Sequence, residues 1–466
     1  MKVGGDALGE VANPVLLTAE AVLPMAGEHR VLREGAVLVK GERVADVGYA
    51  RDLVQRYPDA EVRDYGRAVL MPGLVNAHCH SGLLRGTAED LPVWEWLRVY
   101  IDPMHRVLCP EEAEIASWLC YAESLLSGTT TVVDMWRYME GAARAASALG
   151  NRLVAVPYVG EAEGYDYFDT LDDNEALIES WHGGAQGRVH VWVGVEHQFY
   201  FTEVACQRAS DMALRHGVGL HTHSNESQKE IPEVHRRYGL KPIRALEHLG
   251  LLEPKHVLLA HCVWLDSEEI AVLEKRGISV VHNPTSNMKL ASGASPVDAM
   301  RTAGIAVGLG TDGEKENNNL DMFEEMKFAS LLGKLSTDDA AASNAWDVLR
   351  SATIEGARAL GMDDRIGSLE TGKQADIIAL RADTPRMTPF IPDGEFMNLH
   401  HNIVQAAQGG DVEMVMVNGQ TVVDGGVLLT GDPSAYAVEL ERACHDLLAR
   451  RGAWLKANRE GVLSPV

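Results

Sequence analysis

Apolar, β-branched segments recur along the middle of the chain, and stretches with helical spacing of apolar residues separate most of them. The predicted strands are residues 69–77, 129–135, 152–159, 189–196, 218–223, 257–264, 278–283 and 305–311. The intervening helices include residues 110–126, 207–216, 267–276 and 296–303. Eight buried strands alternating with helices over about 300 residues indicate a (β/α)8 barrel. An open doubly wound sheet is disfavoured, because no glycine-rich phosphate turn follows the first strand.

Shorter β-like runs occur near both ends of the chain, where Gly41-Glu42 and Asn418-Gly419 are typical of hairpin turns. These runs are residues 15–18, 36–40, 43–47, 375–380 and 412–423. We therefore expect an α/β fold: a distorted (β/α)8 TIM barrel with a small composite β-sandwich domain formed from both chain ends. Residues 1–14, rich in glycine and alanine, are expected to be loose.

The expected domain boundaries follow from this division of the chain. Residues 1–68 are assigned to the N-terminal part of the β-sandwich domain and residues 69–370 to the catalytic barrel. Residues 371–430 complete the β-sandwich domain, and residues 431–466 form a C-terminal helical segment.

Composition narrows the function classes. A hydrophobic content of 46% and a charged content of 23% are ordinary for a globular protein. The formal net charge of −25 argues against nucleic acid as a partner, because phosphate binding needs clustered Lys and Arg. No apolar run has the length of a membrane span, and the N-terminus lacks the layout of a signal peptide. The 6 cysteines have no CxxC spacing, which indicates reduced thiols. We expect a cytoplasmic protein that binds neither nucleic acid nor membrane.

Histidine and aspartate residues follow the predicted strands at the end where barrel enzymes carry their active sites. In chain order these residues are His78, His80, His197, His221, His223, His261, His282 and Asp312. A lone histidine at such a place is more often structural, and a Thr-Asp-Gly sequence is commonly a turn. The stability of the fold does not require several separate strands to carry His or Asp at the same end of the barrel. The joint pattern therefore predicts a metal centre.

The predicted metal ligands are His78, His80, His223 and Asp312. Residues i and i+2 of a strand share a face, so the two imidazoles of the first strand can reach one ion. Neutral imidazoles with one carboxylate suit Zn²⁺, with Fe²⁺ as the alternative. Such an ion lowers the pKa of a bound water from 15.7 towards about 7. A binuclear centre bridged by Glu196 is the rival arrangement, and we expect a single ion.

Three residues near this predicted ion are candidates for catalysis. Glu226 is placed to take a proton from the attacking water and to hand it to the substrate. His261 would orient the water or polarise the departing group, and Asp312 could accept a proton in addition to binding metal. For Glu226 the alternative is a carboxylate at the start of a helix.

Longer motifs allow a comparison with known families. They are residues 71–80 (MPGLVNAHCH), 84–86, 88–92, 221–226, 260–263, 282–293 (HNPTSNMKLASG), 308–313 (GLGTDG), 317–320 and 367–376. The chain closely resembles the amidohydrolase superfamily, in the branch of triazine hydrolases and methylthioadenosine/S-adenosylhomocysteine deaminases. The resemblance implies a distorted barrel with a composite β domain, one Zn or Fe ion, hydrolytic deamination or dechlorination, and a homo-oligomer, expected to be a homodimer or homotetramer.

The departures from that branch concern the substrate pocket. His105 stands where adenosine-type deaminases of the branch carry a glutamate for the ribose hydroxyls, and a neutral histidine lacks the paired acceptors of a carboxylate. Gly313 and Glu316 stand where triazine dechlorinases carry Asn and Ser, which disfavours dechlorination. Glu316 could accept hydrogen bonds from an amino- or guanidine-like ring; the alternative is a solvated charge paired with Lys315. The predicted substrate-binding residues are Trp96, His105, His197 and Glu316.

The predicted function is a metal-dependent hydrolytic deaminase. It would release ammonia from an amino-substituted nitrogen heterocycle of purine, pterin, pyrimidine or triazine type by attack of metal-bound hydroxide. The alternatives are an adenosine-type deaminase, a triazine chlorohydrolase, a cyclic amide or lactone hydrolase, and a non-catalytic assembly protein. Ring opening would release no ammonia, and an assembly protein would hold no tightly bound metal.

Overall fold

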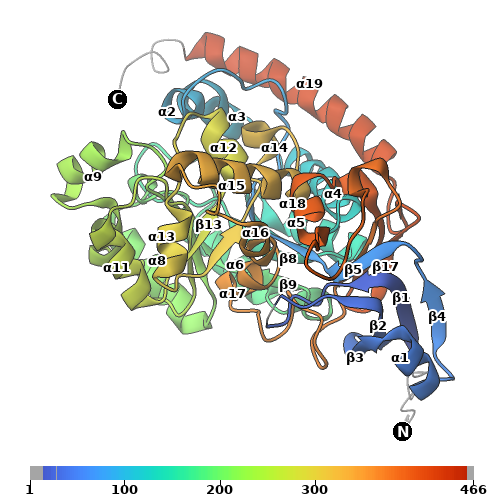
Figure 1. The fold of residues 1–466 in the computed structure, drawn as a ribbon. Helices are drawn as coiled ribbons and strands as arrows, with labels where there is room; N and C mark the ends of the chain where they lie inside the picture. The colour runs from blue at the N-terminus through green and yellow to red at the C-terminus, as the bar shows by residue number, and fades with distance from the viewer. Residues whose placement is uncertain (1–13, 28, 459–466) are drawn as a thin grey trace, which may run out of the picture.

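A computed structural model describes residues 14–27 and 29–458 of the chain (Figure 1). The expectation of a loose N-terminal segment falls, apart from Pro14, outside the described residues. The chain forms two sheets of parallel strands at its centre and one large sheet that joins its two ends.

The central strands are buried and follow one another along the chain. The first parallel sheet contains β6 (Leu74–Cys79), β7 (Thr129–Trp136), β8 (Arg152–Pro157) and β9 (Val189–Val191), in that order. The second contains β10 (Val193–Gly194), β11 (Leu220–Ser224), β12 (Val257–His261), β13 (Ser279–His282) and β14 (Val307–Leu309), in that order. Every residue of β7, β8 and β12 is buried. Burial on both faces explains why these strands are continuous apolar runs rather than alternating ones.

The two parallel sheets meet at both edges. Only Trp192 separates β9 from β10, and its backbone N–H donates to Ala155 O at 2.9 Å, so the strand expected over 189–196 is interrupted there. At the other edge the backbone N–H of Asp312, just beyond β14, donates to His78 O at 3.0 Å.

Helices cover the central strands. The longer ones are α4 (Pro110–Leu126), α5 (Met139–Leu149), α6 (Leu171–Trp181), α8 (Glu203–His216), α9 (Glu230–Tyr238), α10 (Pro242–His248), α11 (Ser267–Arg276), α15 (Met322–Thr337), α16 (Ala345–Ser351), α18 (Leu399–Gln405) and α19 (Pro433–Ala457). The shorter ones are α1 (Ala50–Arg56), α2 (Val93–Trp96), α3 (Asp102–His105), α7 (Gly184–Gly187), α12 (Pro284–Lys289), α13 (Val297–Thr302), α14 (Glu314–Asn317) and α17 (Ile354–Ala359). Leu97–Ile101 form a π-helix, η1. Short 3₁₀ helices are η2 (Gln198–Tyr200), η3 (Pro385–Met387) and η4 (Gly409–Asp411).

Capping residues fix the ends of these helices. The predicted helix 267–276 is α11, because the Asp266 side chain accepts from the backbone N–H groups of Glu268 and Glu269, and Gly277 ends the helix at φ +66°. The helix predicted over 207–216 begins earlier, at Glu203, because the Thr202 hydroxyl caps it by accepting from Ala205 N.

Strands from both ends of the chain share one nine-stranded sheet, as expected. It contains β1 (Val15–Val22), β2 (Leu32–Lys40), β3 (Arg43–Tyr49), β4 (Glu61–Asp64), β5 (Ala68–Pro72), β15 (Ile377–Arg381), β16 (Val412–Val417), β17 (Gln420–Asp424) and β18 (Val427–Leu428). The order is β18-β17-β16-β15-β5-β1-β2-β3, and β4 pairs with β1. The antiparallel pair β5–β15 joins the two ends.

The expectation of one strand over 69–77 is wrong. Its first half is β5 in the terminal sheet, and its second half is β6 in the first parallel sheet, with Gly73 between them. A Cβ on Gly73 would lie 2.2 Å from the Thr130 side chain, so the chain can change sheets here only with glycine.

None of the helices within residues 14–27 and 29–458 is long and apolar enough to cross a membrane. All six cysteines are free thiols.

Candidate metal centre and active-site cavity

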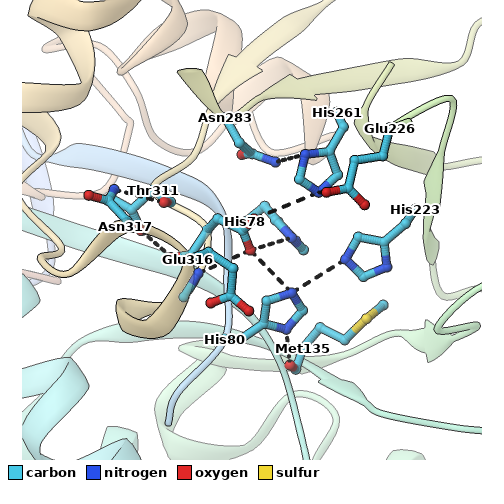
Figure 2. A network of polar contacts seen from close by, with 12 residues as sticks. His78, His80, Met135, His223, Glu226, His261, Asn283, Thr311, Glu316 and Asn317 are labelled. Atoms are coloured by element: carbon cyan, nitrogen blue, oxygen red, sulfur yellow. Dashed lines mark hydrogen bonds and ion pairs between the residues drawn. The ribbon is translucent and has the colours of Figure 1, made fainter. Parts of the chain in front are cut away.

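Five side chains from four strand ends converge in the interior of the central unit (Figure 2). His78 lies in β6 and His80 just after it, His223 lies in β11, His261 ends β12, and Asp312 follows β14. All five are buried, with exposed fractions of 7% or less.

The distances place these side chains around one point. Asp312 Oδ1 lies 3.4 Å from His78 Nε2 and 3.3 Å from His80 Nε2. His80 Nε2 and His223 Nε2 are 3.3 Å apart, and Asp312 Oδ2 is 3.7 Å from His261 Nε2. The ligand atoms of His78, His80 and Asp312 lie within 4.8 Å of one another, as do those of His78, His223 and His261.

Backbone carbonyls fix the tautomers of two of the histidines. His80 Nδ1 lies 2.6 Å from Met135 O, and His223 Nδ1 lies 2.6 Å from Glu196 O. A carbonyl oxygen only accepts, so in each ring Nδ1 carries the proton and Nε2 keeps its lone pair. Both lone pairs are therefore directed to the point where the side chains converge.

His78 is oriented by a second histidine. His221 Nδ1 donates to Leu258 O at 2.8 Å, which leaves His221 Nε2 as an acceptor for His78 Nδ1–H, also at 2.8 Å. His78 Nε2 is thereby an acceptor, and it has no hydrogen-bond partner among the described residues. The predicted strand-end residue His221 thus orients the candidate ligand His78, and both of its own ring nitrogens are occupied by hydrogen bonds.

The chemistry of these donors fits a divalent ion. Burial holds the pKa of His78, His80 and His223 below the ordinary value, so the rings are neutral. Burial would raise the pKa of Asp312, but the facing imidazoles, His78 foremost, outweigh it, and the pKa lies well below its usual value. Neutral imidazole lone pairs facing an ionised carboxylate are what Zn²⁺ and Fe²⁺ prefer.

The backbone around the centre is held in an unusual conformation. Asn225, His261, Cys262 and Asp312 are all non-glycine residues with positive φ, between 47° and 72°. Such residues cost free energy, and they cluster at active sites whose surroundings hold them in place. Here the left-handed turns redirect the chain at the ends of β11, β12 and β14.

Glu226 and His261 lie together at one side of the centre, as Figure 2 shows. Glu226 Oε1 is 3.9 Å from His261 Nε2, and the other ring nitrogen of His261 is 2.9 Å from Asn287 Oδ1. Burial raises the pKa of Glu226, although His261 opposes this effect. Glu230 accepts from the backbone N–H groups of Asn225 and Glu226, both at 3.0 Å, and so fixes the backbone of the predicted proton carrier.

A cavity opens on the centre, and three of the four predicted substrate-binding residues line it. Trp96, His197 and Glu316 belong to its wall, together with His80, His223, Glu226, His261 and Asp312. Trp94 and Phe199 also line it and make an edge-to-face contact at 5.9 Å. Glu196 lies in the wall as well, where it accepts from Tyr158 OH at 2.8 Å, and burial raises its pKa to about 7.

His105 does not reach the cavity formed by the described residues, which differs from the expectation. Its ring is 2% exposed and stacks behind Tyr158, with 4.7 Å between the ring centres. The wall residue nearest in sequence is Asp102, at the start of the same short helix α3, and burial raises its pKa to about 6. One turn of helix therefore separates the predicted position from the carboxylate that faces the cavity.

Glu316 is not a solvated loop charge. It is 5% exposed, and its carboxylate lies 3.0 Å from Lys315 Nζ, which is also buried. Burial raises the pKa of Glu316 to about 8, and Lys315 opposes this. The pairing with Lys315 that the sequence offered as an alternative thus coexists with a place in the cavity wall.

Sequence reasoning missed several cavity residues. Asp102, Arg98, Tyr165, Arg237 and Glu230 line the cavity. The aromatic run Tyr165-Asp166-Tyr167-Phe168 lies in the loop after the predicted strand 152–159, and this position could have identified Tyr165. Arg237 lies on α9, and no local pattern points to it.

Comparisons with known proteins agree on one family. Residues 69–422 match the amidohydrolase family. The 5-methylthioadenosine/S-adenosylhomocysteine deaminase of Caldanaerobacter subterraneus subsp. tengcongensis is 37% identical, over 90% of this chain and 96% of that protein. The crystal structure of an adenosine deaminase from Xanthomonas campestris with bound zinc has a TM-score of 0.88 and 30% identity, covering 93% of this chain and 98% of that one. The zinc-bound atrazine chlorohydrolase of Arthrobacter aurescens, at 24% identity and a TM-score of 0.84, covers 92% of this chain and all (100%) of its own, and shares the fold.

Proposed function

We propose that the substrate of this chain is an adenosine-type nucleoside. The chain belongs to the amidohydrolase family, and it is a metal-dependent hydrolase that deaminates an amino-substituted nitrogen heterocycle. The convergence of the imidazole lone pairs with Asp312, beside Glu226, is the observation that carries the proposal. The resemblance to nucleoside deaminases over nine-tenths of the chain supports the substrate class.

His78, His80, His223 and Asp312 would hold one ion, which we assign as zinc. An ion held there lowers the pKa of a bound water towards about 7, so that the nucleophile is available at neutral pH. His261 stays outside this set as a residue that orients the water, since Asn287 and Glu226 hold its ring from both sides.

Glu226 moves the protons in this proposal. Its carboxylate takes a proton from the attacking water and delivers it to the ring nitrogen beside the reacting carbon. The C–O bond forms as the ring nitrogen gains this proton, so that the reacting carbon becomes tetrahedral. The remaining proton of the new hydroxyl group then passes through Asp312 to the amino group, the C–N bond breaks, and the products are the oxo-ring and ammonia. A pKa raised by burial suits a group that must both accept and donate at neutral pH.

The rest of the cavity would hold the nucleoside. Trp96 and Trp94 offer flat apolar faces to the ring, and His197 and Glu316 offer polar contacts near the metal centre. We assign the ribose hydroxyls to Asp102, because a carboxylate supplies the paired acceptors that the buried His105 does not bring to the cavity.

The domain organisation is part of the proposal. We propose that the two parallel sheets close into one distorted (β/α)8 barrel with the catalytic centre at one end. Within the expected residues 69–370 this barrel would begin at β6, because β5 belongs to the terminal sheet. Within the expected ranges 1–68 and 371–430, the described residues would form a β-sandwich domain, and those of 431–466 a C-terminal helical segment. The shared cluster of Leu17, Val37, Leu70, Ile377 and Met414 supports a curled sheet. A homodimer or homotetramer in the cytoplasm remains a prediction from the sequence.

The test is ammonia release combined with a metal count on the purified full chain. Methylthioadenosine, S-adenosylhomocysteine, adenosine, a pterin and an aminotriazine would be assayed side by side. We expect about one zinc per chain and ammonia from the nucleosides. Ammonia from the pterin or triazine alone would overturn the substrate class. Bound metal without ammonia from any ring would favour a cyclic amide or lactone hydrolase, and absence of metal a non-catalytic role.

A further inference from the structure

One continuous segment supplies a large part of the cavity wall. It consists of α2, the π-helix η1 and α3, and its cavity-lining residues are Val93, Trp94, Trp96, Leu97, Arg98, Ile101 and Asp102. None of them belongs to the predicted metal ligands. Trp94 and Trp96 would face the ring and Asp102 the ribose, so this wall would bind the nucleoside and not the ion. We call residues 93–105 the wall segment.

The middle of the wall segment departs from regular α-helical hydrogen bonding. The backbone N–H of Asp102 donates to Leu97 O, which is the five-residue spacing of a π-helix. Such turns are rare and occur as single turns, frequently at functional sites. A donor from outside the segment that binds a carbonyl of η1 can therefore help to hold this turn in place.

The C-terminal helix α19 provides that partner (Figure 1). The Arg451 guanidinium donates to Val99 O, inside η1, at 2.6 Å, and lies 5.7 Å from the centre of the Tyr100 ring. One residue earlier, Arg450 pairs with Glu112 at 2.5 Å and donates to Val107 O at 3.2 Å. Two consecutive arginines of α19 thus hold the chain on both sides of α3.

A third contact extends the connection to the opposite loop of the cavity. Trp454 of α19 faces Arg106, with 5.5 Å from the guanidinium to the ring centre. Arg106 in turn lies 3.9 Å from the Tyr167 ring centre and donates to Gly164 O at 3.2 Å. That loop carries Tyr165, which lines the cavity.

We propose that α19 is a positioning element for the substrate pocket, and that Arg451 sets the place of the wall segment through Val99. The inference rests on the proposed nucleoside deamination, because the wall segment would bind the nucleoside through Trp94, Trp96 and Asp102. Arg451 touches neither the predicted metal ligands nor Glu226 through any contact recorded among the described residues, so it acts on binding and leaves the chemical step alone.

The experiment compares KM and kcat for the best nucleoside substrate in R451M and wild type. Methionine keeps an unbranched side chain in place of the aliphatic part of arginine and removes the donor to Val99 O. Loss of one charge-assisted hydrogen bond predicts a KM about tenfold higher, with kcat changed less than about twofold. R451K keeps a cationic donor and should recover much of the affinity. The matched control is R442M, on the same helix, where Arg442 is 76% exposed and contacts Glu439.

The outcomes separate the possible failures. A merely structural role for Arg451 would lower kcat and melting temperature together and leave KM in place, which would overturn the proposal. An unchanged KM in R451M, or the same change in R442M, would do so as well. If R451M does not fold, W454L breaks the contact with Arg106 and is judged by the same rise in KM. If the wild type releases no ammonia from any nucleoside, the proposed function itself is wrong.

Discussion

At the scale of single residues, the centre depends on where protons sit in the imidazoles. Met135 O and Glu196 O accept from the Nδ1 atoms of His80 and His223, and each bond turns a lone pair towards Asp312. Histidine is the residue that can be set in this way, because a bond at one nitrogen decides the state of the other. The backbone thereby turns the candidate metal-ligating atoms towards the same point.

Glu226 is the residue whose replacement should stop the reaction and leave the metal site intact. Substitution by glutamine keeps the shape and removes the group that carries the proton. Activity should fall about 10²–10⁴-fold. Ammonia release measured together with zinc content tests this, with Glu203→Gln, an exposed glutamate on α8, as the control. Activity within a few-fold of wild type at full zinc occupancy would rule out the proton-carrier role.

The sequence predicted these residues because a strand end is a definite place in a barrel. Their positions along the chain, each at the end of a predicted strand, were enough to assign five side chains to one rim of the barrel: His78, His80, His223, His261 and Asp312. His105 was misplaced because its direction depends on the turn of α3, and the π-helix before it shifts that turn relative to a regular helix. Arg237 could not be found, since α9 is brought to the cavity by tertiary packing alone.

At the scale of elements, the short helix α14 places ionisable side chains in the interior of the protein. Its four residues are all buried, and Glu314, Lys315 and Glu316 are three charged side chains in a row. Helix α15 fastens it, because Asn317 donates to Glu325 Oε1 at 2.6 Å and also to Thr311 O at 2.8 Å. The sequence showed the run of charges but not its burial, which depends on how α15 packs.

Glu325 should make stability depend on pH. Burial raises its pKa from 4.5 to about 8 in the folded chain. Between those two values the folded state keeps a proton that the unfolded state has released, so this group lowers stability as pH rises and has no further effect above about pH 8. Glu325→Gln is neutral throughout. Its melting temperature relative to wild type should therefore rise by about 3 °C or more between pH 5 and pH 9.

Thermal unfolding of both proteins across that pH range measures the effect. Glu324→Gln is the control, since Glu324 is the exposed neighbour on α15. The quantity compared is the difference in melting temperature between variant and wild type, and how this difference changes with pH. Altered packing in the variant shifts its melting temperature by the same amount at every pH, so it does not affect this comparison. Parallel curves for Glu325→Gln and wild type would mean that Glu325 is ionised in the fold.

At the scale of the whole molecule, the terminal sheet and the central strands are joined by a buried ion pair. Arg152 on β8 contacts Asp376, just before β15, through Nε at 3.1 Å and Nη2 at 3.0 Å, and both side chains are at most 3% exposed. Asp376 also accepts from the backbone N–H of Asn418 at 2.8 Å. The sequence pattern predicted two units built from distant segments, but a pairing 224 positions apart could not be read from it.

Asp376→Asn should therefore destabilise the protein far more than the loss of a surface pair. It leaves the Arg152 charge buried without a counterion, which costs about 3–5 kcal/mol. Urea unfolding should show this loss, whereas Glu114→Gln, which weakens the part-exposed pair with Arg144, should cost at most about 1 kcal/mol. Adding Arg152→Met to Asp376→Asn removes the stranded charge and should restore part of the stability. If the double variant is as unstable as the sum of the two single ones, the two side chains are not coupled, and the packing around β8 and β15 alone holds the two units together.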